Sequence, residues 1–154
     1  MAKTVLVVDD DPTQRRLIQA VLEREGFGFA QAESGDAALK HLTTGGAADV
    51  ILLDLVMPGL SGQDALKELR ARGCRFSLDD FGSGLSSFRY LKTLPVDFLK
   101  IDGEFIANVA QDAVDRSMVE AISQVGRTLG IATVAERVET AAVLAELEKI
   151  GIDF

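Results

Sequence analysis

Ionisable side chains follow directly on short apolar segments at several places in the sequence. The residues in these positions are Asp9 and Asp10, Asp54, Asp79 and Asp80, Lys100, and Glu136. Carboxylates gathered in one place repel one another unless a cation or a lysine lies among them. Hard divalent cations prefer oxygen ligands of this kind, and Mg²⁺ is the first candidate. The alternative is that these acids cap the helices that follow, which explains one or two of them but not the repetition.

The segments that must position these side chains alternate between strand-like and helix-like patterns. Short apolar runs predict strands at 5–8, 27–32, 50–53, 75–78, 96–99 and 131–135. Helical periodicity and helix-boundary residues predict helices at 13–25, 34–41, 62–72, 85–93, 113–129 and 139–150. Such alternation predicts a parallel sheet covered by helices, with ligands bound at the carboxyl ends of its strands. The acids and the lysine should therefore share one edge of the sheet.

Composition and charge exclude several classes of protein. The chain carries a net charge of −8 and no basic run, which argues against binding to nucleic-acid phosphates. No apolar run approaches the roughly 20 residues of a membrane span, and the N-terminal residues lack a signal-peptide pattern. Cys74 is the one cysteine, so an internal disulfide is excluded and a reducing, cytoplasmic location is expected.

Residues 3 to about 72 carry a first family resemblance. An acidic pair follows the first strand, and the run Asp54-Leu55-Val56-Met57-Pro58-Gly59 follows the third, which closely resembles the response-regulator receiver domain. The resemblance implies a flavodoxin-like fold in which Asp54 accepts a phosphoryl group from a histidine kinase or a small phosphodonor. It also implies that Asp9, Asp10 and a backbone carbonyl near Met57 hold Mg²⁺, which neutralises the charge that converges when a carboxylate attacks phosphorus.

The receiver pattern changes beyond the third strand–helix unit. Asp79 stands where the family has a Thr or Ser hydroxyl, and its charge would repel phosphoryl oxygens. Lys100 ends the next strand, as the family lysine does, but Ile101-Asp102 follows it in place of proline. The sequence leaves open whether Lys100 reaches Asp54.

Residues from about 66 to 154 carry a second resemblance, to the EAL-type cyclic di-GMP phosphodiesterases. Three ordered motifs support it: Asp79-Asp80-Phe81-Gly82-Ser83-Gly84, the run from Leu94 to Asp102, and Val134-Ala135-Glu136-Arg137-Val138-Glu139-Thr140, in which Arg137 replaces the usual Gly. The family is a TIM-type barrel. The resemblance implies that Asp79 and Asp80 bind metal, that Lys100 polarises the attacking water or a phosphate oxygen, and that Glu136 holds the metal or its water.

Other motifs of this second family are missing from the sequence. They are the namesake Glu-Ala-Leu, the Asn and Glu ligands of the intervening strands, and the Gln-Gly-Tyr after the last strand. Two-metal phosphodiester hydrolysis needs ligands for both ions, and the loss of one key stabilising group costs a factor of about 10²–10³ in rate. Efficient hydrolysis is therefore not expected. Binding of cyclic di-GMP through the turn 82–87 is expected to be weak or absent.

The two resemblances meet inside one predicted helix, at residues 65–72, which would suit either family. A crossover inside a shared helix favours an engineered chimera over a natural deletion product. The fold expected is α/β: one open parallel sheet with flanking helices, of flavodoxin-like order 2-1-3-4-5, extended by a further strand–helix unit from a TIM-type barrel. We expect residues 1–154 to form a single fused domain, receiver-like at 1–72 and EAL-barrel-like at 73–154, unless two chains pair as a homodimer through exposed sheet edges.

Three functions compete at this point. The favoured one is a folded scaffold with a residual Mg²⁺ site and no efficient catalysis. The second is a phosphoacceptor that uses Asp54 with Asp9, Asp10 and Lys100. The third is residual binding or hydrolysis of cyclic di-GMP.

Overall fold

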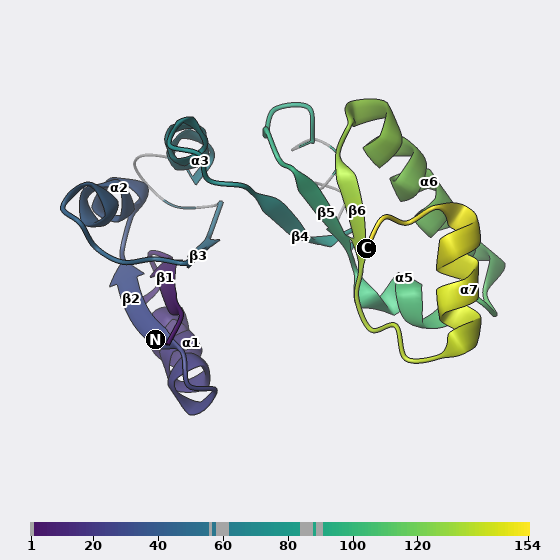
Figure 1. The fold of residues 1–154 in the computed structure, drawn as a ribbon, viewed down its shortest axis with the longest axis horizontal. Coiled ribbons are helices and arrows are strands. Elements are labelled where there is room, and N and C mark those ends of the chain that lie inside the picture. Colours follow the sequence, from purple (N-terminus) through teal and green to yellow (C-terminus); the bar gives the residue numbers. More distant parts are fainter. Residues whose placement is uncertain (1, 56, 58–61, 84–87, 89–90) are drawn as a thin grey trace. The chain divides into compact units, whose positions relative to one another are not determined.

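The computed structural model describes residues 2–55, 57, 62–83, 88 and 91–154. The chain divides into two compact units, Met1–Cys74 and Arg75–Phe154 (Figure 1). This division falls beside the boundary that the sequence predicted between the receiver-like and EAL-like parts. Joining of the two parts in a single fused domain stays a prediction.

The first unit is a three-stranded parallel sheet with helices on both faces. Its elements are β1 (Thr4–Val8), α1 (Pro12–Arg24), β2 (Gly28–Ala32), α2 (Gly35–Thr43), β3 (Val50–Leu53) and α3 (Gly62–Ala71). The strand order is β2-β1-β3, as predicted. Val8 pairs with Ala32 on one side and Leu53 on the other. All three strands therefore end at the same level, and the residues that follow them meet at one edge.

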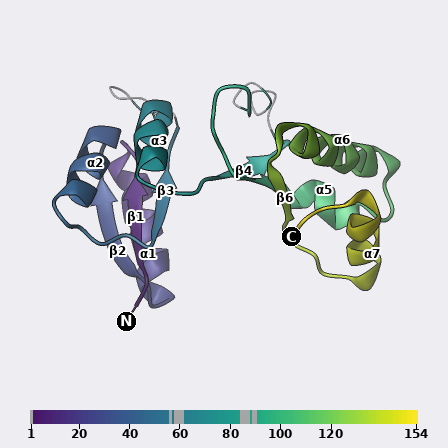
Figure 2. The same ribbon diagram turned by 45° about the horizontal axis from the view of Figure 1, so that its top comes forward.

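Short-range signals fix the helices of this unit. The Asp11 side chain caps α1 by accepting a hydrogen bond from the Thr13 amide at 2.8 Å, and Pro12 occupies the first turn, where its missing N–H is not needed. Ser34 caps α2 in the same way through the Ala37 amide. Helix α2 packs over a core of Leu6, Val8, Ala32 and Ala38, with Ile51 and Leu53 beside it. Figure 2 shows α1 on the opposite side of this sheet from α2.

The second unit is also a three-stranded parallel sheet. Its elements are β4 (Ser77–Phe81), β5 (Phe98–Ile101), α5 (Gly103–Asn108), α6 (Ala113–Leu129), β6 (Ala132–Ala135) and α7 (Ala141–Ile150). The order is β4-β5-β6, and α5, α6 and α7 gather on one side of the sheet (Figure 1). Phe81, Leu99, Ile101, Ile106 and Ile122 form its fully buried core. The predicted helix at 85–93 lies mostly outside the described residues, and the short helix α5 was not predicted.

The α/β class with parallel strands and flanking helices is confirmed, and the single extended sheet of order 2-1-3-4-5 stays a prediction. Every ladder partner of β3 among the described residues lies on β1, and every partner of β4 lies on β5. Within each unit the described strands form one sheet, β2-β1-β3 in the first and β4-β5-β6 in the second.

Two strand boundaries in the second unit also differ from the sequence prediction. Asp79 and Asp80 lie inside β4, and Lys100 lies inside β5, whereas all three were expected just after their strands. Glu136 does follow β6 directly, as predicted. Beyond α7, Phe154 pairs with β6. The Phe154 amide donates to the Thr133 carbonyl, and the Ala135 amide donates to the Phe154 carbonyl. This pairing is consistent with the predicted beginning of a further strand.

Candidate metal centres

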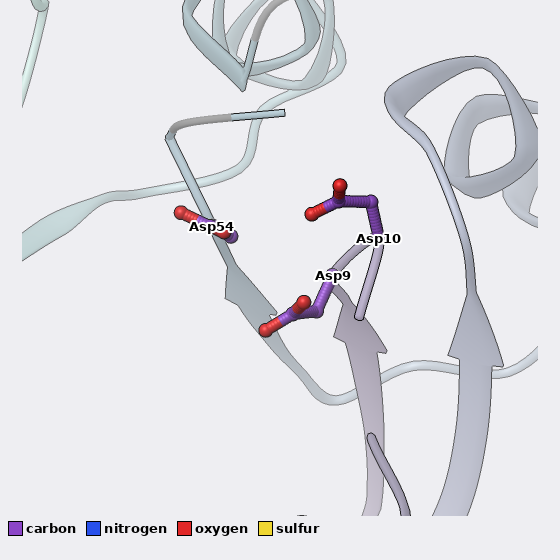
Figure 3. A group of neighbouring side chains, drawn as sticks. All are labelled: Asp9, Asp10 and Asp54. Atoms are coloured by element: carbon purple, nitrogen blue, oxygen red, sulfur yellow. The ribbon is translucent and has the colours of Figure 1, made fainter. Parts of the chain in front are cut away.

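The first candidate centre, the N-terminal carboxylate cluster, consists of Asp9, Asp10 and Asp54. One carboxylate oxygen from each lies within 4.8 Å of the others. Figure 3 shows Asp9 and Asp10 in the turn after β1 and Asp54 at the end of the neighbouring β3, around a common space. Asp9 and Asp54 are half-buried and Asp10 is exposed, so the cluster is open to solvent on one side. Three oxygens at this spacing suit a hard divalent cation that keeps several water ligands.

The backbone explains how residues so far apart in sequence come together. The Asp54 amide donates to the Val8 carbonyl at 2.9 Å, and the Asp9 amide donates to the Ala32 carbonyl at 3.2 Å. These bonds continue the two ladders of β1 by one residue past the end of each strand. The Asp9 carboxylate also accepts a hydrogen bond from the Asp11 amide at 2.8 Å, which holds the turn into α1.

Arg15 is a neighbour of this cluster that the sequence analysis missed. Its Nη1 donates to the main-chain carbonyl of Asp9 at 2.6 Å, and its Nε donates to Gln31 Oε1 at 3.0 Å. Its position in the sequence gave a weak signal, since Arg15 lies one helical turn after the cap Asp11, at the end of α1 that is near the cluster. An arginine at the start of an amphipathic helix is usually a solvated surface residue, so this position did not stand out.

The second candidate centre, the C-terminal carboxylate cluster, consists of Asp79, Asp80 and Glu136. Their carboxylate oxygens likewise lie within 4.8 Å of one another. Consecutive residues of a regular strand point to opposite faces, which would separate Asp79 from Asp80. The β4–β5 register shifts between Leu78 and Phe81, and Asp80 has a positive φ of 48°. This irregularity turns the two neighbouring carboxylates toward the same site.

Lys100 lies among these carboxylates. Its Nζ forms an ion pair with Asp79 Oδ1 at 2.9 Å and a second, close ion pair with Glu136 Oε1. Partial burial works against the charge on Lys100, but its hydrogen bonds to Glu136 and Asp79 outweigh burial, so the pKa of Lys100 is raised above the usual lysine value. Lys100 is therefore a permanent cation at neutral pH and neutralises part of the negative charge of the cluster.

The structure thus groups the predicted site residues into two sets, one in each unit. The N-terminal carboxylate cluster contains the predicted phosphoacceptor Asp54, and the C-terminal carboxylate cluster contains Lys100. Assistance of Asp54 by Lys100 stays a prediction. The metal ligand expected near Met57 and the turn at 82–87 lie largely outside the described residues. In the described part of that turn, the Ser83 hydroxyl donates to the Asp80 carbonyl at 2.8 Å and thereby stabilises the irregular backbone of β4 at Asp80.

Within the described part of the chain, no helix is both long enough and apolar enough to cross a membrane.

Comparison with protein families identifies the same two segments as the sequence motifs. The model described as the EAL domain matches residues 54–154, and the model described as the response regulator receiver domain matches residues 5–78. Both predicted resemblances are therefore confirmed. The two matches overlap at residues 54–78, which is consistent with a fusion of one family to the other inside this segment.

Curated relatives match more than half of the chain. Cyclic di-GMP phosphodiesterase PdeB of Shewanella oneidensis is 48% identical over 93 residues, which is 60% of this chain and 11% of that protein. The bifunctional diguanylate cyclase/cyclic di-GMP phosphodiesterase MucR of Pseudomonas aeruginosa is 49% identical over 86 residues, which is 56% of this chain and 13% of that protein. The chain therefore spans only a small fraction of the relatives that it matches.

Solved structures show similar likenesses. A complex of the PaMucR phosphodiesterase with c-di-GMP aligns with a TM-score of 0.61 and 30% identity, covering 93% of this chain and 64% of that one. The manganese and cyclic di-GMP complex of Klebsiella pneumoniae BlrP1 aligns with a TM-score of 0.55 and 33% identity, covering 57% of this chain and 22% of that one.

Proposed function

The chain belongs to the EAL domain family and also carries a receiver-domain segment, and on that premise we propose that it is an engineered fusion that folds and binds divalent cations without efficient catalysis. The observation that carries this proposal is that each unit keeps one cluster of three carboxylates. Relatives support the cation, since the BlrP1 complex contains manganese. The residues that would hold Mg²⁺ are Asp9, Asp10 and Asp54 in one unit and Asp79, Asp80 and Glu136 in the other.

Weak or absent phosphodiesterase activity follows from the ligand set. Hydrolysis by two metal ions clamps both the attacking and the leaving oxygen, and each ion needs its own ligands. The receiver-like segment 5–78 directly precedes Asp79, and the sequence given contains no Glu-Ala-Leu tripeptide. One ligand cluster that already contains a lysine is a poor substitute for a two-ion centre.

The direct test is cyclic di-GMP turnover in the presence of Mg²⁺ or Mn²⁺. We expect product formation by the wild-type chain to equal that of the Asp79→Asn variant, because neither holds a complete two-ion centre. Multiple turnover that disappears in Asp79→Asn would overturn the proposal in favour of a working hydrolase. Binding without turnover, measured by equilibrium dialysis with labelled cyclic di-GMP, would leave the scaffold assignment intact and support the weak-binding alternative.

The second candidate function is phosphoacceptance by Asp54. The specific observation in its favour is the grouping of Asp9, Asp10 and Asp54, which supplies both a nucleophilic carboxylate and the ligands of a charge-neutralising cation. Intact mass after incubation with acetyl phosphate and Mg²⁺ tests it, with Asp54→Asn as the control. We expect no gain of mass, because efficient transfer also needs a cationic group at the phosphoryl oxygens and Lys100 is paired with Asp79 and Glu136. A single phosphoryl gain that the control lacks would establish the phosphoacceptor function instead.

A further inference from the structure

We propose that Arg15 is a positioning residue for the N-terminal carboxylate cluster and that it raises the affinity of this cluster for a divalent cation. The inference rests on the proposed function, because it needs the cluster to bind a cation. Arg15 carries a charge of the same sign as the cation. Arg15 can therefore favour cation binding only by positioning the ligands.

The contacts of Arg15 connect three elements at the edge where the cluster lies. Arg15 stands in the first turns of α1, its Nη1 donates to the Asp9 carbonyl after β1 at 2.6 Å, and its Nε donates to Gln31 on β2 at 3.0 Å. The planar guanidinium has its donors in a fixed relative geometry, so binding to two acceptors at once restrains both. The bond to Asp9 is partly buried, where a charge-assisted hydrogen bond is stronger than in water.

The restrained atom belongs to the residue that the site depends on. The Asp9 amide and side chain are already held by Ala32 and by the Asp11 amide, and Arg15 holds its carbonyl. The peptide plane that joins Asp9 to Asp10 contains this carbonyl, so fixing it also fixes the direction in which Asp10 leaves the strand. Two of the three carboxylates therefore depend on Arg15 for their placement relative to Asp54.

Charge and geometry predict opposite effects for the loss of Arg15. A cation beside three carboxylates competes electrostatically with a bound metal ion, so removal of its charge alone should tighten Mg²⁺ binding. Loss of an outer residue that orients ligands typically weakens metal affinity by about 10- to 100-fold. The sign of the change in affinity therefore separates the two roles.

The experiment compares Arg15→Met with Arg16→Met in the full chain. Both remove one positive charge from neighbouring positions on α1, and Arg16 is exposed. Mg²⁺ alone is titrated, and the amide resonances of Asp9, Asp10 and Asp54 are followed by ¹H–¹⁵N NMR, so that the C-terminal carboxylate cluster does not interfere. We expect Arg15→Met to weaken binding by about tenfold, Arg16→Met to leave it unchanged or slightly tighter, and Arg15→Lys to recover part of the loss through the Asp9 carbonyl.

Two further results make the outcome decisive. If Arg15→Met does not fold, Gln31→Leu removes the second anchor at an exposed position without a change of charge, and we expect weaker Mg²⁺ binding there too. Equal Mg²⁺ affinities for Arg15→Met and Arg16→Met would overturn the proposed role of Arg15 but not the cation site. If Gln31→Leu has to be used instead, an affinity equal to that of the wild type would have the same meaning. Absence of any Mg²⁺ response at these resonances in the wild type, together with no effect of Asp54→Asn, would overturn both this inference and the cation site of the proposed function.

Discussion

At the scale of single residues, backbone strain is found around the C-terminal carboxylate cluster. Among the described residues, Asp80 and Arg137 are the non-glycine residues with positive φ, at 48° and 55°. Both lie in or directly beside the cluster. The strain at Asp80 has a structural use, since it turns Asp80 toward Asp79. The strain at Arg137 coincides with the position where the related phosphodiesterase motif usually has glycine.

Replacement of Arg137 by glycine should stabilise the second unit. A non-glycine residue in the left-handed region costs about 1–2 kcal/mol, and glycine removes this strain. Glycine also increases the conformational entropy of the unfolded chain, which offsets part of the gain, so we expect the free energy of unfolding to rise by about 1 kcal/mol. Urea unfolding followed by the methyl resonances of Ile122 measures it. Arg137→Ala is the matched control, because it removes the side chain that lies against Gly103 but keeps the strained φ. Equal gains for both variants would show that the side chain, and not the backbone, is the source of strain.

Lys100 is expected to compete with a metal ion for Asp79 and Glu136. In Lys100→Met the cluster loses its internal cation, and a unit charge in such a partly exposed site contributes about 1 kcal/mol. We therefore expect Mg²⁺ to bind the C-terminal carboxylate cluster about fivefold more tightly than in wild type. The Asp80 and Glu136 amide resonances report the titration. Lys92→Met makes the same change of charge at an exposed position, and an equal effect there would reduce the role of Lys100 to net charge.

The raised pKa of Lys100 also predicts how its contribution to stability depends on pH. Because its pKa is raised in the folded state, the stability that Lys100 contributes is fully present below the ordinary lysine value of 10.5 and is lost as pH rises through the folded value. The difference in Tm between wild type and Lys100→Met should therefore stay constant from about pH 7 to about pH 9.5 and shrink above about pH 10.5. A difference that shrinks well below that range would contradict the raised pKa.

At the scale of elements, the last strand of the second unit depends on the segment that follows α7. Asp153 Oδ2 accepts from the Thr133 amide at 2.8 Å and from its hydroxyl at 2.9 Å, and Thr133 is 1% exposed. The aromatic ring of Phe154 also meets that of Phe98 edge-on, with centroids 6.2 Å apart. Residues 152–154 therefore cover the edge of β6 and satisfy its buried polar groups.

Removal of the Asp153 carboxylate should destabilise this edge. Asp153→Ala leaves the buried Thr133 amide and hydroxyl without their acceptor, which costs about 1–3 kcal/mol. Urea unfolding monitored at Thr133 and Ile122 measures the loss. Glu148→Ala, an exposed acid on α7, is the control for charge and is expected to change stability by less than about 0.5 kcal/mol. A loss no larger than that of the control would mean that water replaces the carboxylate.

At the scale of the whole molecule, the prediction is that the two units behave as one domain. Each unit comprises about half of the chain, and domains of fewer than roughly 80 residues bury a small fraction of their surface and are marginally stable alone. Neither unit has a disulfide to compensate, since Cys74 is the one cysteine. The predicted single fused domain is therefore also the arrangement that stability favours.

Cooperative unfolding tests this prediction. We expect the methyl resonances of Leu6 in the first unit and Ile122 in the second to disappear at the same urea concentration, and Arg137→Gly to shift both transitions together. Two separate midpoints, with only the Ile122 transition moved by Arg137→Gly, would show two independent domains. Size-exclusion chromatography with light scattering beside this experiment tests the alternative of a homodimer formed through sheet edges.

Local structure and the identity of the candidate ligands could be predicted from the sequence. Apolar runs and caps predicted most of the strands and helices, because these signals act over a few residues. The positions of Asp9, Asp54 and Glu136 at strand ends followed from the same pattern and are confirmed. Pairs of motifs from two families placed the junction near residue 72, where the structure also divides.

Which of these residues come into contact depends on how the strands and helices pack together. Strand pairing is non-local, so the sequence could not show the register of β3 on β1 or of β4 on β5. The bulge at Asp80 and the pairing of Lys100 with Asp79 and Glu136 depend on register between strands, which a single strand does not encode. Arg15 was missed for the same reason: its partners Asp9 and Gln31 become neighbours only after β1, β2 and α1 have packed together.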